Sequence, residues 1–173
     1  SPVMPPWPAC PFELDMPLDL GTPGRQNTAF VANRGPDILD VRHSPTRPAA
    51  GEEIMVTARV LDNDGVASVM LRHRIEGSST TFAAVPMLDD GSGGDEIAGD
   101  HFYTCAIPGA TAGRIRAFYI EASDGLASTR FPTRLESTAE APERTCLIRA
   151  GDPQIAGRLA NYRIEVRLDA KTK

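Results

Sequence analysis

Short runs of alternating apolar and polar residues fill the middle of the chain. In the clearest run, Ile54, Val56, Ala58 and Val60 are separated by single residues of more mixed character. Because successive side chains of a strand point to opposite sides, this period of two predicts a strand over residues 53–61 with one buried face. Turn sequences separate it from similar runs, so we predict seven strands, at 37–43, 53–61, 66–75, 80–88, 101–107, 114–122 and 127–131.

The same alternation predicts which side chains form the core. No apolar period of 3.6 residues extends over ten or more positions in residues 36–132, so a parallel sheet covered by helices is disfavoured. The predicted fold is all-β: a β-sandwich of about seven antiparallel strands with extended flanks. The two sheets would share one dry interior, which we expect to contain Ile54, Val56, Val60, Val69, Leu71, Ile115 and Tyr119.

Both flanks differ in composition and sequence pattern from this central region. Residues 1–35 are rich in proline, which disfavours helix, and are predicted to be an arm or the end of an upstream domain. Residues 133–173 begin with a polar linker and continue with strand-like runs at 144–149 and 162–168. These runs would form either a hairpin of their own or the start of a downstream domain, and we favour the second. The predicted organisation is therefore 1–35, 36–132 and 133–173.

Composition and charge exclude some classes of partner. The 173 residues carry a net charge of -5, and their 18 basic residues form no stripe, so no nucleic-acid partner is expected. The 15 prolines and 15 glycines suit a fold with many turns. No apolar stretch approaches the roughly 20 residues that a membrane-spanning helix needs, so we expect no membrane insertion.

The three cysteines are too far apart for a metal site of the C-x-x-C kind. Cys105 lies in a strand-like run and is predicted to be a small buried hydrophobe. A disulfide between Cys10 and Cys146 would clamp the two flanks together, and sequence alone leaves that pairing open.

An acidic, glycine-rich segment at residues 88–100 is the one local sequence with chemical content. It places Asp89, Asp90, Asp95 and Asp100 among four glycines. Hard cations need six to eight oxygen ligands, so one interpretation is a calcium site formed by these four aspartates. The other, which we favour, is a structural crossover in which the aspartates accept backbone N–H groups and need no metal.

Catalytic patterns are absent from the sequence. His43, His73 and His101 lie on different predicted strands, and no H-E-x-x-H, G-x-S-x-G, P-loop or dinucleotide motif is present. His73 falls on an apolar face, where a partly buried, hydrogen-bonded histidine is expected. A catalytic pair of carboxylates in the acidic segment would need a cleft and an oriented acid with a raised pKa, and the sequence places neither. The sequence therefore predicts a protein that is not an enzyme.

Several short sequences in the central region together resemble a known module. They are Pro36-Asp-Ile, His43-Ser-Pro, Thr57-Ala-Arg-Val-Leu-Asp, Gly65-Val-Ala-Ser-Val, Met87-Leu-Asp-Asp-Gly, Gly94-Asp95, Ala98-Gly-Asp100, Phe102-Tyr103, Ile107-Pro108 and Phe118-Tyr-Ile-Glu-Ala-Ser-Asp124. Through them, residues 36–132 resemble the immunoglobulin-like or fibronectin type III-like modules of large secreted bacterial proteins, which occur beside lamin-tail-like and spore-coat-protein-H-type kinase-like domains.

The resemblance implies an extracellular or cell-surface location and a non-catalytic structural or interaction role. Its expected partners are neighbouring domains of the same polypeptide, and extracellular polysaccharide or protein. The alternative is a carbohydrate-binding accessory module, which would need exposed, coplanar aromatic side chains.

Overall fold

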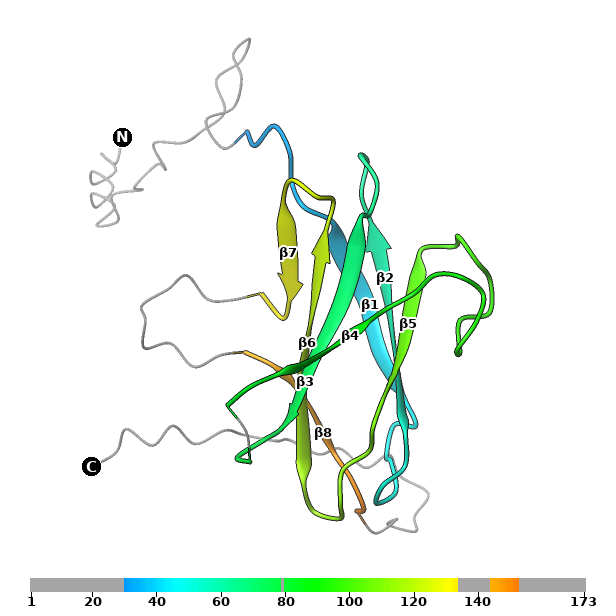
Figure 1. Cartoon of the computed structure of the whole chain (residues 1–173), viewed down its shortest axis with the longest axis vertical. Coiled ribbons are helices and arrows are strands. Elements are labelled where there is room, and N and C mark those ends of the chain that lie inside the picture. Colours follow the sequence, from blue (N-terminus) through cyan, green and yellow to red (C-terminus); the bar gives the residue numbers. More distant parts are fainter. Residues whose placement is uncertain (1–29, 79, 134–143, 153–173) are drawn as a thin grey trace, which may run out of the picture. The chain divides into compact units, whose positions relative to one another are not determined.

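The computed structural model describes residues 30–78, 80–133 and 144–152 (Figure 1). The chain divides into two compact units, Ser1–Ala32 and Asn33–Lys173, and every described strand belongs to the second. The described residues contain no helix, and hence none that could cross a membrane. The strands are β1 (Asp37–Ser44), β2 (Ile54–Leu61), β3 (Ser68–Ile75), β4 (Ala83–Pro86), β5 (Phe102–Ile107), β6 (Ile115–Ser123), β7 (Ser128–Phe131) and β8 (Cys146–Arg149).

The strands form two antiparallel sheets, which confirms the predicted all-β sandwich. One sheet has the order β1-β2-β5. The other has the order β4-β3-β6-β7, and β8 also pairs with β6. β4 lies at the edge of its sheet and ends at Pro86, where the missing N–H of proline costs no ladder hydrogen bond.

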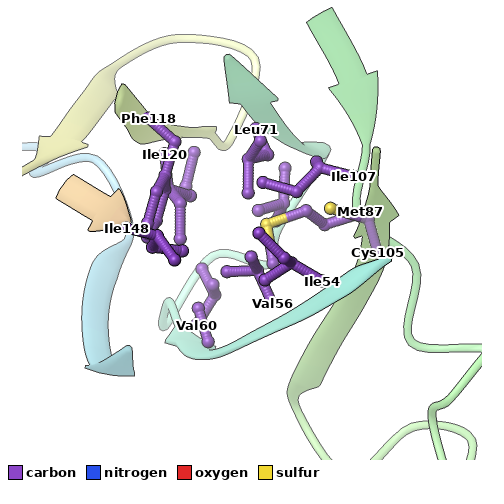
Figure 2. Close-up of a cluster of buried hydrophobic side chains, with 13 residues drawn as sticks. Ile54, Val56, Val60, Leu71, Met87, Cys105, Ile107, Phe118, Ile120 and Ile148 are labelled. Atoms are coloured by element: carbon purple, nitrogen blue, oxygen red, sulfur yellow. The ribbon is translucent and has the colours of Figure 1, made fainter. Parts of the chain in front are cut away.

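The core lies between the two sheets (Figure 2). The central strand β2 follows its sequence pattern strictly, because its alternate residues from Ile54 to Val60 are all 0% exposed. Cys105 is buried among them, as the sequence predicts. The buried cluster consists of Ile54, Val56, Ala58, Val60, Val69, Leu71, Met87, Cys105, Ile107, Phe118, Ile120, Ala122 and Ile148.

β6 turns the opposite face to the core from the one predicted. In its register with β3, Leu71 lies opposite Ile120 and His73 opposite Phe118, so Phe118 and Ile120 point inward. Ile115 and Tyr119 were expected in the core, and that expectation is wrong. Tyr119 is nevertheless only 7% exposed, because other side chains cover it on the outer face of the sheet.

That outer cover comes from an aromatic ring and a guanidinium. The Phe82 ring meets Tyr119 edge-on, with centroids 4.9 Å apart. The Arg130 guanidinium carbon lies 3.6 Å from the centroid of the same tyrosine ring. β6 is therefore apolar on both faces, and its period-two pattern does not distinguish the inner face from the outer one.

The segment after the linker joins this sandwich. β8 pairs with the first half of β6, and Ile148 is 3% exposed within the core. This differs from the expectation that residues 144–149 begin a downstream domain or form a separate hairpin. The run at 162–168 lies outside the described residues, and the outer domain limits stay predictions.

The chain enters and leaves the sandwich at opposite ends (Figure 1). The Pro36 carbonyl, just before β1, accepts a hydrogen bond from the Thr129 hydroxyl of β7. Beyond the other end of β1, the Gly151 N–H donates to the Pro48 carbonyl at 2.9 Å, just after β8. β1 has eight residues, so the two points are separated by roughly 25 Å at about 3.3 Å per residue.

Candidate cation site in the acidic loop

The acidic segment forms a long loop between β4 and β5 that is tied to the sandwich at both ends. Leu88 and Thr104 exchange backbone hydrogen bonds of 3.0 and 2.8 Å. At the other end, the His101 carbonyl accepts a hydrogen bond from the Val60 N–H at 3.0 Å. These bonds fix the two ends of the loop beside the three-stranded sheet.

Three of the four predicted ligands converge. Single carboxylate oxygens of Asp89, Asp95 and Asp100 all lie within 4.8 Å of one another, and Asp95 is only 8% exposed. Asp90 is outside this group. One of its oxygens accepts hydrogen bonds from the N–H and hydroxyl of Ser92, at 3.0 and 2.7 Å.

The same three carboxylates accept backbone hydrogen bonds. Asp89 alone accepts the N–H groups of residues 99, 100 and 101, at 2.7, 3.2 and 2.9 Å. Asp95 accepts the Gly91 N–H at 2.7 Å, and Asp100 accepts the Phe102 N–H at 3.0 Å. These are the hydrogen bonds that the structural crossover interpretation requires.

Close packing explains one of the glycines in the loop. Gly94 has a φ of 103°, and a Cβ at this position would lie 2.6 Å from the terminal methyl of Met55. Met55 belongs to the outer face of β2, so the loop packs on the outside of the three-stranded sheet. A carboxylate oxygen has more than one lone pair, so backbone bonding leaves coordination capacity on the three aspartates. The geometry is compatible with both interpretations.

A cavity of about 350 Å³ lies beside the start of this loop. Tyr103 and Asp89 both line it, and burial, followed by the charge of Asp89, raises the pKa of Tyr103. Its lining is Val66, Ala67, Ser68, Val69, Met70, Pro86, Met87, Leu88, Asp89, Asp90 and Tyr103.

The histidines are not brought together. The His43 ring lies 3.1 Å from the Pro45 carbonyl, within its own turn. His73 is 7% exposed, and its Nδ1 lies 2.9 Å from an Nη of Arg116, so the expected buried, hydrogen-bonded histidine is confirmed. The other Nη of Arg116 donates to the Gly109 carbonyl at 2.9 Å. Burial, followed by the charge of Arg116, lowers the pKa of His73.

Both described thiols have a raised pKa. Burial raises the pKa of Cys105 to about 12 and that of Cys146 to about 11, so neither is a thiolate near neutral pH. Cys105 and Cys146 form no disulfide among the described residues, and the Cys10–Cys146 bridge stays open because Cys10 lies outside them.

Three aromatic rings, those of Phe82, Phe102 and Tyr119, are covered by arginines rather than presented as a platform. The Arg74 guanidinium lies 4.3 Å from the Phe82 centroid. Phe102 has two such neighbours, Arg42 at 5.3 Å and Arg59 at 5.9 Å. Sequence reasoning did not single out Arg42 and Arg59. Their only signal is that each lies on the polar side of an alternating run.

Comparisons of the chain with family models and with curated proteins find no match.

Proposed function

We propose that the sandwich is a non-catalytic module that spaces or presents neighbouring domains of a secreted, multidomain bacterial protein. The resemblance to immunoglobulin-like and fibronectin-like modules suggested this role, together with an extracellular or cell-surface location. The observation that carries the proposal is that the chain enters the sandwich at one end, beside Pro36, and leaves it at the opposite end, beside Gly151. A rigid body with this connection holds whatever precedes it away from whatever follows it.

The interior supports the same role. The sheets enclose an apolar core, and the buried polar pair His73 and Arg116 is engaged in hydrogen bonds. Because catalysis needs an acid, base or nucleophile that can reach a substrate, a histidine held in this way has no evident catalytic role.

Energy transfer between two dyes would test the spacer geometry. Labels introduced at Arg34 and Asp152 of the 173-residue chain should report one narrow distance, unchanged until cooperative unfolding. Leu71→Asp, which places a carboxylate at a core position with 0% exposure, provides the unfolded reference. A broad distance distribution in the folded chain would contradict the proposal.

Retention of the chain on polysaccharide columns would instead favour the carbohydrate-binding alternative. The covered rings of Phe82, Phe102 and Tyr119 give that alternative little support among the described residues. Phe30 is 57% exposed but has no coplanar aromatic partner among them.

Calcium binding in the acidic loop is a second candidate function, favoured by the convergence of Asp89, Asp95 and Asp100. Calcium would take oxygen ligands from these carboxylates and stabilise the folded state by mass action. Thermal melting should then give a higher midpoint in calcium than in chelator. Asp95→Asn, which keeps an acceptor oxygen but removes the charge, should abolish the difference.

Asp90→Asn is the matched control for this test, because Asp90 lies outside the converging group and is exposed. The control should retain the full calcium shift. Equal melting midpoints with and without calcium in the unchanged chain would exclude the calcium site. The structural crossover would then be the remaining interpretation.

A further inference from the structure

The outer face of the three-stranded sheet carries two arginines that share one aromatic ring. Arg42 of β1 pairs with Thr57 of β2, and Arg59 of β2 pairs with Phe102 of β5. Directly opposite residues of antiparallel strands point to the same side, so all four side chains belong to one face. The guanidinium carbon of Arg42 lies 5.3 Å from the Phe102 centroid, and that of Arg59 lies 5.9 Å from it. The separation of the two guanidinium carbons is therefore at most the sum of these two distances.

Neither guanidinium has a hydrogen-bond or ion-pair partner among the described residues; their contacts there are those with Phe102. Arg59 Nε is buried without an acceptor among the described residues, and the Arg42 side chain is exposed. Both arginines therefore have donors without a partner among the described residues, and both guanidinium groups lie near the same ring. Asp100, near in sequence, is turned toward Asp89 and Asp95.

Two like charges on one ring repel each other, and an anion between them would remove the repulsion. A single carboxylate is matched by the fork of one arginine, so two guanidinium groups beside one ring suit an anion that carries two charges. In the next row of the same face, the Thr57 hydroxyl accepts a hydrogen bond from the Thr104 hydroxyl at 3.4 Å and keeps its own proton to donate.

We propose that Arg42 and Arg59, positioned by Phe102, form a binding site for a tetrahedral dianion, that is, a sulfate or phosphate group. This site adjoins the end of the acidic loop, where the Phe102 N–H donates to Asp100 at 3.0 Å, and it does not depend on the spacer role. Phe102 is a positioning residue, because it acts through the two arginines.

The first test is an NMR titration of the isotope-labelled 173-residue chain with sodium sulfate, compared with sodium chloride at the same ionic strength. The Nε–H signals of Arg42 and Arg59 should move in a saturable way with sulfate and not with chloride. Arg59→Gln should weaken sulfate binding about tenfold or more, since it removes charge-assisted hydrogen bonds. Phe102→Leu should weaken it about two- to fivefold, the effect expected of a lost cation–π contact.

Arg114→Gln is the matched control, because it makes the same change of charge at an exposed turn. It should leave sulfate binding unchanged, and thermal melting should show that all three variants stay folded. Equal responses to sulfate and chloride would overturn the proposal. So would an Arg59→Gln protein that binds sulfate as well as the Arg114→Gln protein does.

A second titration tests the need for two charges and separates the two ligand sources. A phosphate monoester such as glycerol phosphate loses its second charge below about pH 6, whereas sulfate keeps both. Binding of the monoester should therefore weaken several-fold between pH 7.5 and 5.5, while binding of sulfate stays constant. A monoester that binds more tightly than inorganic phosphate at pH 7.5 would assign the site to phosphate esters. Monoester binding that is unchanged by pH would contradict a dianion site.

Discussion

The arginines of the two sheets differ in their interaction partners. In the five-stranded sheet, Arg72 is paired with Glu121 at 2.6 Å, and Arg116 bonds to His73 and to the Gly109 carbonyl. In the three-stranded sheet, Arg42 and Arg59 have Phe102 and no hydrogen-bonding partner among the described residues. A cation that is engaged within the fold contributes to stability. One that is held in place but left unpaired is available to a ligand.

The sharpest test of this difference compares Arg116→Ala with Arg59→Gln. Removal of Arg116 leaves His73 and the Gly109 carbonyl without a buried donor and opens a cavity, so the free energy of unfolding should fall by about 3 kcal/mol. Arg59→Gln should change it by less than about 0.5 kcal/mol. Urea unfolding measures both. Similar losses in the two variants would remove the distinction between the sheets.

Asp89→Ala extends the comparison to the loop beside the three-stranded sheet. The carboxylate of Asp89 accepts three backbone N–H groups, so its removal should lower the free energy of unfolding by about 2 kcal/mol in chelator. Asp90→Ala, with bonds to Ser92 only, is the control and should cost less. A negligible loss for Asp89→Ala would mean that the loop does not depend on this clamp.

The buried pair of the five-stranded sheet should also make stability depend on pH. Burial, followed by the charge of Arg116, lowers the pKa of His73 from its usual 6.5, so the folded state binds the proton less readily than the unfolded chain does. The stabilisation is complete above pH 6.5 and is lost as the pH falls below this value toward the lowered pKa. Unfolding free energies at pH 7.5, 6.5 and 5.5 should show the decrease. His73→Gln should reduce that dependence, and an unchanged pH profile in this variant would exclude His73 as its source.

The smallest effect is expected for Arg72→Gln. The side chains of Arg72 and Glu121 are 38% and 36% exposed, and an exposed ion pair contributes about 0.5 kcal/mol or less. A double-mutant cycle with Glu121→Gln would measure the coupling, which should decrease in high salt. A coupling above about 1 kcal/mol would show that the outer face of this sheet is stabilised more strongly than its exposure implies.

The sequence predicts strands well where one face is apolar and the other is not. β2 is such a strand, and its buried and outward positions were both predicted. In β6, Ala117 and Tyr119 on one side are as apolar as Phe118 and Ile120 on the other, and the inward Arg116 reinforces the wrong assignment. Only the pairing of β6 with β3, which joins residues about fifty positions apart, identifies its inner face.

The candidate sites show the same limit. The density of aspartates indicated the acidic loop, but the local sequence does not show that Asp90 turns away while Asp89, Asp95 and Asp100 converge. The contact of Arg42 and Arg59 with Phe102 depends on the register of three strands. A sequence window along any single strand contains no information about such a register.

The position of the two chain ends has a mechanical consequence. Because the chain enters beside the start of β1 and leaves after β8 at the far end, a pull on Pro36 and Gly151 is directed along the strands. The hydrogen bonds of the β1–β2 and β6–β8 ladders would then be loaded together in shear, rather than broken one at a time as in peeling. A module connected in this way resists extension far better than its equilibrium stability alone would suggest, and single-molecule stretching of the chain would measure that resistance.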